Sequence, residues 1–171
     1  DGVRQCFMPL ESHRIQNLSE LVAALKLTPR QIQECFRVLG HILSTETDKR
    51  GKLLWCLSVA SIAMSAFRIG KPEIFQQLGN QCLTPNDAIL LLRGDLKLKD
   101  VEWWFTLFAT GHGILFKEGQ NVIDVLKEAG LMSNDSDSVP GYFSQWYQGW
   151  GHSSENRFAQ THQRIEHIMQ W

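Results

Sequence analysis

The feature that most constrains the fold is a helix-start signal that occurs twice in the chain. Thr28-Pro29-Arg30-Gln31 and Thr84-Pro85-Asn86-Asp87 both place Thr at the N-cap and Pro at the first helical position. Pro is favourable there because its missing N–H would have no intrahelical partner. A Thr cap with a side-chain acceptor three residues later satisfies backbone N–H groups that are otherwise free. Each signal therefore predicts a helix that begins at its proline.

Apolar residues recur at helical spacing through most of the chain, and no alternating pattern longer than a few residues indicates a strand. Helices are expected at residues 17–27, 28–44, 52–69, 72–79, 84–92, 101–109, 120–129 and 154–171. The first of these is assigned to a capping box at Asn17, and the last to a cap at Ser153-Ser154. The predicted fold is all-α, an irregular bundle of about eight or nine helices.

The helix expected at 28–44 has two contrasting faces. Spacing of i, i+3, i+4, i+7 predicts that one face is buried. That face comprises Ile32, Cys35, Phe36, Leu39, Ile42 and Leu43. The opposite face carries Arg30, Glu34, Arg37 and His41, a charged stripe of a kind that is most often simply solvated. Residues 52–69 are apolar nearly all round, so we expect that helix to be central in the core.

The run Ser-Asn-Asp-Ser-Asp-Ser at 133–138 is the clearest surface loop and marks a boundary. Residues 1–132 are predicted to form the helical lobe before it. Residues 139–171 form an aromatic-rich C-terminal helical segment that we expect to pack on this lobe, giving one compact domain.

The aromatic residues after this boundary have two open interpretations. They could pack between two helical layers, or they could form a partner-binding surface containing Tyr142, Trp146 and Trp150. A base-stacking platform is disfavoured because such platforms lie in a positively charged groove. This stretch has no Lys or Arg between Leu131 and Asn156.

Charge and hydropathy exclude several classes of partner. The 171 residues carry a formal net charge of -1 without a run of Lys and Arg, so we expect neither nucleic-acid nor membrane binding. The longest apolar stretch, 53–67, is roughly 15 residues, short of the ~20 that a membrane span needs. Four cysteines without a C-x-x-C pair indicate a reducing compartment, and a cytoplasmic location is predicted. The chain begins at Asp1 rather than methionine, which suggests a fragment.

No catalytic apparatus is predicted within the chain. Gly70-Lys71 suggests a phosphate loop, but that motif needs glycine at position 65 and Ser or Thr at position 72. Those positions hold Ser65 and Pro72. His162 and His167 lie about 140° apart around a helix, so they do not converge on one metal ion. We therefore expect no catalytic residue, metal or cofactor in this segment.

The run LTPRQIQECFRVL at residues 27–39 resembles the helix that follows the ATPase core in KAP-family P-loop NTPases, where it belongs to a helical lid beside the nucleotide. The resemblance implies that Arg30 faces the nucleotide phosphates and that Arg37, two turns on, is a second candidate. It also implies ATP and Mg²⁺ in the parent protein, held by an upstream NTPase core. The phosphate loop, the Mg²⁺-binding acid and the parallel sheet of that core are absent here.

Two hypotheses follow from these patterns. In the first, the chain is the lid and C-terminal effector region of a KAP-type NTPase, inactive alone, and its aromatic helices contact a partner or another protomer. Family members take part in signalling scaffolds in animals and in phage exclusion in bacteria. In the second, the chain is a self-contained helical interaction module unrelated to nucleotide. This second hypothesis predicts an exposed apolar patch around Trp146 and Trp150, and an Arg30 paired with Glu34 or a neighbouring carboxylate.

Overall fold

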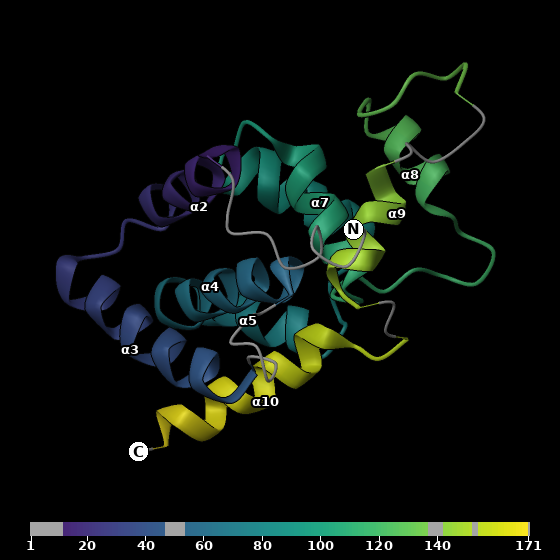
Figure 1. Ribbon diagram of the computed structural model, residues 1–171. Coiled ribbons are helices and arrows are strands. Elements are labelled where there is room, and N and C mark those ends of the chain that lie inside the picture. The colour runs from purple at the N-terminus through teal and green to yellow at the C-terminus, as the bar shows by residue number, and fades with distance from the viewer. Residues whose placement is uncertain (1–11, 47–53, 137–141, 152–153, 171) are drawn as a thin grey trace.

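A computed structural model describes residues 12–46, 54–136, 142–151 and 154–170 of the chain. Within these ranges the fold consists of nine α-helices and one π-helical turn, with no strand (Figure 1). A single isolated bridge joins Leu83 and Ile114. The prediction of an all-α, multi-helix fold is therefore confirmed.

The helices follow one another along the chain. Their bounds are α2 (Ser12–Ala24), α3 (Pro29–Glu46), α4 (Trp55–Gly70), α5 (Pro72–Gly79), α6 (Pro85–Leu90), the π-helix η1 (Leu91–Asp95), α7 (Val101–Thr110), α8 (Val122–Glu128), α9 (Tyr142–Gly149) and α10 (Arg157–Met169).

Both Thr-Pro signals start helices as predicted. The backbone N–H of Gln31 donates to Thr28 Oγ1 at 3.3 Å, and that of Thr28 donates to Gln31 Oε1 at 2.8 Å. At the second signal, the Asp87 N–H donates to Thr84 Oγ1 at 3.2 Å. Because these local bonds satisfy the first-turn N–H groups, the start of each helix can be read from a few residues.

Two other predicted starts are wrong. Helix α2 begins at Ser12, so Asn17 lies within it; its side chain is buried and donates from Nδ2 to Asp100 Oδ2 at 3.4 Å. Helix α10 begins at Arg157, where Asn156 accepts a hydrogen bond from the Ala159 N–H at 2.9 Å. Asn is suited to a cap or to a tertiary hydrogen bond, and only the packed fold decides between these uses.

The helix predicted at 84–92 continues beyond residue 92, through Gly94. After α6 the backbone widens into the π-helix η1, and the Leu96 N–H donates to the Leu91 carbonyl at 2.9 Å. This wider turn keeps both Leu91 and Leu92 buried. The helix continues because burial of two consecutive leucines outweighs the tendency of Gly94 to end a helix.

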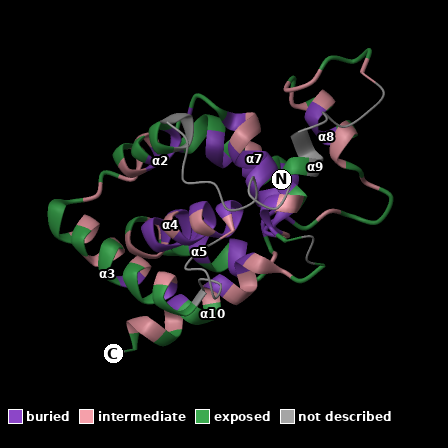
Figure 2. Ribbon diagram, viewed as in Figure 1, coloured by how far each residue is buried: buried purple, intermediate pink, exposed green. Residues whose placement is uncertain are grey.

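Helix α4 lies at the centre of the molecule, as predicted. It packs against α2, α3, α5, α9 and α10, and most of its residues are buried (Figure 2). The hydroxyls of Ser61 and Ser65 donate to the Leu57 and Ser61 carbonyls, each at 2.7 Å. These internal bonds let small polar residues lie in the core without unsatisfied groups.

The C-terminal helices share the core of the helices before them. Helix α9 packs on α7 and α4, whereas α10 crosses α3, α4 and α5. One cluster of buried apolar residues runs from Leu18 in α2 to Ile165 in α10. The loop predicted at 133–138 connects α8 to α9, and its last residues lie outside the described ranges.

Candidate functional site

Arg30 lies in the first turn of α3, where the Thr28 cap fixes the backbone. Its side chain is exposed and makes no hydrogen bond or ion pair with another described residue. The second hypothesis expects Arg30 to be satisfied by Glu34, but Arg30 acts on that carboxyl only through a weak charge interaction. Arg30 therefore has a guanidinium available to a ligand.

A surface groove of about 630 Å³ lies beside Arg30 at the start of α3. Its walls come from the first three turns of α3 and from Ile69 near the end of α4. The lining residues are Thr28, Arg30, Gln31, Gln33, Glu34, Arg37 and Ile69. The groove brings together the two arginines that the resemblance singles out.

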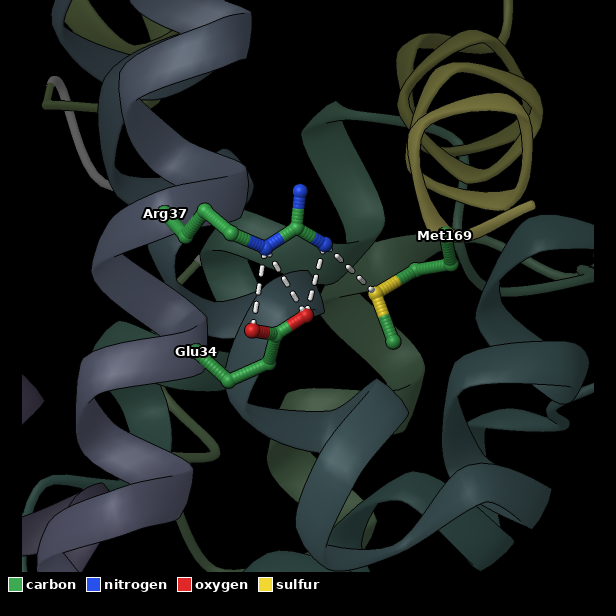
Figure 3. Close-up of polar contacts among 3 residues, drawn as sticks. All are labelled: Glu34, Arg37 and Met169. Atoms are coloured by element: carbon green, nitrogen blue, oxygen red, sulfur yellow. Dashed lines mark hydrogen bonds and ion pairs between the residues drawn. The ribbon is translucent and has the colours of Figure 1, made fainter. Parts of the chain in front are cut away.

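Arg37 differs from Arg30 because it already has a carboxylate partner. Its Nε and Nη2 donate to Glu34, with the shortest contact 2.6 Å from Nη2 to Oε1 (Figure 3). These bonds hold the pKa of the Glu34 carboxyl below its usual value and raise that of the Arg37 guanidinium. Nη2 also lies 3.9 Å from the Met169 sulfur in α10. Arg37 therefore joins two helices, whereas Arg30 does not.

The predicted partner-binding residues Trp146 and Trp150 are core residues. They are 5% and 1% exposed, and the Tyr142 side chain lies outside the described residues. The Trp146 ring lies 4.7 Å from that of Trp55 between ring centroids, and Trp150 Nε1 donates to Thr110 Oγ1 at 2.9 Å. Because both indoles are enclosed by other helices, neither can contact a partner in this fold. The core-packing interpretation applies to these two residues, and the surface interpretation is corrected.

The apolar stripe predicted for α3 is only partly buried. Val38 and Ile42 are 1% exposed, whereas Phe36 is 68% exposed. Phe36 lines a small apolar cleft of about 70 Å³ with residues of α2 and α4. The prediction of burial is wrong for Phe36 because α3 lies at the edge of the bundle, with neighbours on one side.

The remaining candidate residues do not assemble a chemical site. Burial raises the pKa of the Cys35 thiol to about 11, which keeps it protonated and a poor nucleophile at neutral pH. His162 stacks on Phe75 with ring centroids 4.4 Å apart, and its Nε2 lies 2.9 Å from Gln76 Oε1. Across the described residues, no three His, Cys, Asp or Glu side chains are placed to share a metal ion.

Sequence reasoning missed a second groove, which lies between α3 and α10. It has a volume of about 630 Å³ and is lined by Arg37, His41, Thr45, Gln163, Arg164, His167 and Ile168. Two residues of the charged stripe on α3, Arg37 and His41, line one wall of this groove. Nothing in the sequence indicates the other wall, because α10 follows more than a hundred residues later and its approach depends on packing over α4 and α5.

Comparisons with known proteins identify no relative of this chain. A scan against protein-family models matches none, and searches of curated proteins and of solved structures return no significant match. The resemblance at residues 27–39 therefore depends on the sequence alone. Among the described helices, none combines the length and the apolar character that crossing a bilayer requires.

Proposed function

We propose that this chain is the helical lid and effector region of a KAP-type P-loop NTPase, in which Arg30 senses nucleotide. The observation that carries the proposal is the exposed guanidinium of Arg30 at the capped start of α3, which bonds to no other residue in the described part of the chain. The residues that resemble the family, 27–39, coincide with this cap and the first turns of α3. A guanidinium there can donate parallel hydrogen bonds to phosphate oxygens and stabilise negative charge at the γ-phosphate.

Under this proposal the chain contributes an arginine and a lid surface, and an upstream core holds ATP and Mg²⁺. The acidic side chain in the described lining of the Arg30 groove, Glu34, is engaged by Arg37. It is therefore poorly suited to hold a metal ion. Arg37 is a weaker candidate for the same reason, since a phosphate would have to compete with a carboxylate already in place.

A cytoplasmic location belongs to the same proposal. Neither Cys35 nor Cys82 forms a disulfide with another described residue. A reducing compartment maintains cysteines in this state.

The proposal is tested first by the size of the native protein. An antibody against this chain should detect a band several times heavier than 19.6 kDa in extract of the source cells. In that full-length protein, Arg30→Ala should lower ATP turnover about tenfold or more, because a charge-stabilising arginine acts mainly on the transition state. Lys117→Ala, which removes an exposed cation in the loop before α8, should leave turnover unchanged. A band at 19.6 kDa, or unchanged turnover in Arg30→Ala, would contradict the proposal.

A second candidate is a self-contained helical interaction module. The observation that favours it is the exposed groove between α3 and α10. Its described lining residues include no group of side chains placed to share a metal ion. Trp146 and Trp150 are buried and cannot form the contact surface predicted for such a module. The groove is the contact surface proposed in their place. The same blot separates the candidates, because a self-contained module would migrate at the mass of this chain.

A further inference from the structure

Glu34 of α3 has two arginines as possible partners on its own helix. It lies four residues after Arg30 and three residues before Arg37, and both spacings make side chains neighbours on a helix surface. All three residues line the groove at the start of α3. The partner that this carboxylate takes therefore decides which guanidinium remains available to a ligand.

In the structure Glu34 is held by Arg37. Arg37 Nε donates to the two carboxylate oxygens at 3.1 and 3.0 Å, and Nη2 donates to Oε1 at 2.6 Å (Figure 3). The Met169 sulfur lies 3.9 Å from the same Nη2. The hydrogen bonds from Arg37 are the main cause that lowers the pKa of the Glu34 carboxyl, and the charge of Arg30 is the weakest. Arg30 forms no hydrogen bond or ion pair with a described residue.

The order of the three residues along α3 favours this pairing. On a helix, the better oriented ion pair has the acid N-terminal to the base, as Glu34 is to Arg37. Arg30 and Glu34 stand in the opposite order. A pair with the less favourable order still forms in part when it has no competitor, because exposed pairs four residues apart stabilise helices. Without Arg37, Glu34 would therefore pair with Arg30.

The first turn of α3 also makes Arg30 attractive to any nearby anion. The N-terminal end of a helix carries partial positive charge, so a cation there is not compensated by the helix itself. No acidic residue occupies the first turn of α3. A nucleotide phosphate that approaches Arg30 would compete with Glu34, the acidic side chain in the described lining of the groove.

We propose that Arg37 is a positioning residue that holds Glu34 and so keeps Arg30 available to nucleotide. The inference rests on the proposed function, since it concerns the same arginine, and it gives Arg37 a role other than that of a second sensor. Arg37 acts on Arg30 only through the shared carboxylate. Removal of Arg37 should therefore be harmful only while Glu34 is present.

The first experiment follows the Arg30 side chain in the intact chain, without nucleotide. The ¹⁵N heteronuclear NOE of its Nε–H group reports picosecond-to-nanosecond mobility. This NOE should be low in the parent chain, rise in Arg37→Gln as Glu34 pairs with Arg30, and fall again in the double variant Arg37→Gln with Glu34→Gln. Circular dichroism checks that each variant is folded. If Arg37→Gln is not, Arg37→Met replaces it with the same expected result.

ATP turnover in the full-length protein gives the functional comparison. Arg37→Gln should lower kcat about two- to threefold, because an exposed helix pair would leave roughly a third to a half of Arg30 unpaired. Adding Glu34→Gln should restore kcat, since the competing carboxylate is then gone. Lys117→Gln removes the same charge from the exposed loop before α8 and should change neither kcat nor KM.

Two results would overturn the inference. One is an Arg30 side chain that stays mobile in folded Arg37→Gln. The other is an equal loss of turnover in Arg37→Gln and in the double variant, which would mean that Arg37 acts on nucleotide directly. Failure of the proposed function looks different. Arg30→Ala then leaves turnover unchanged, while the mobility of Arg30 in the isolated chain still depends on Glu34 and Arg37.

Discussion

Helices α3 and α4 are neighbours of similar length, yet they are held in place by different forces. Helix α4 has no side-chain cap at its first residue, and most of its residues are buried on all sides. Helix α3 has a reciprocal Thr28–Gln31 cap and an Arg37–Glu34 pair, but among its residues of described burial only Val38 and Ile42 are well buried. The comparison indicates that α4 depends almost entirely on tertiary packing, whereas α3 adds local interactions to the packing of one face on α4 and α10 and keeps its other face exposed.

The largest expected effect is at Phe67 of α4. This ring is 0% exposed and lies 6.3 Å from the Phe108 ring between centroids. Phe67→Ala should lower the free energy of unfolding by about 3–5 kcal/mol, because it removes buried apolar surface and leaves a cavity. Urea unfolding followed by circular dichroism measures the change.

Phe36→Ala on α3 is the matched control for Phe67→Ala. Its ring is 68% exposed, so the same chemical change should alter the free energy of unfolding by less than about 0.5 kcal/mol. Similar losses for the two variants would remove the contrast between a buried and an exposed helix.

A smaller effect is expected at the N-cap of α3. Thr28→Ala should cost about 1 kcal/mol because the Gln31 N–H loses its acceptor at an exposed helix end. Hydrogen exchange should accelerate at the amides of residues 30–32. Thr28→Ser retains an oxygen in the same position and serves as the control. If exchange is equally fast in both variants, the cap does not hold the start of α3.

The smallest effect compares two histidines on α10. His162 is half-buried against Phe75, and burial is the main cause that lowers its pKa; His167 is exposed. Because the folded pKa lies below the unfolded value of about 6.5, the folded state binds fewer protons than the unfolded state near that pH. Stability is therefore full above about pH 6.5 and falls as the pH drops toward the folded pKa.

Urea midpoints measured between pH 7.5 and 5 test this dependence. His162→Gln should flatten the decline, since it removes the titrating group and retains a hydrogen-bonding side chain beside Gln76. His167→Gln should leave the decline as in the parent chain. An unchanged decline in His162→Gln would mean that other groups set the pH dependence.

Local chemistry made much of the fold predictable. The Thr28 and Thr84 caps and the proline after each of them place the starts of α3 and α6. The apolar character of residues 52–69 indicates the central position of α4. In each case the deciding interactions lie within a few residues of one another, so the sequence alone contains them.

Packing among distant helices determines which apolar and polar side chains find partners. Phe36 and Trp146 both occur in apolar helical patterns, yet one is exposed and the other buried. Asn17 and Asn156 are both plausible caps, yet only Asn156 serves as one. The groove between α3 and α10 joins residues more than a hundred positions apart. Periodicity states which residues share a face, but only packing among distant helices determines what that face meets.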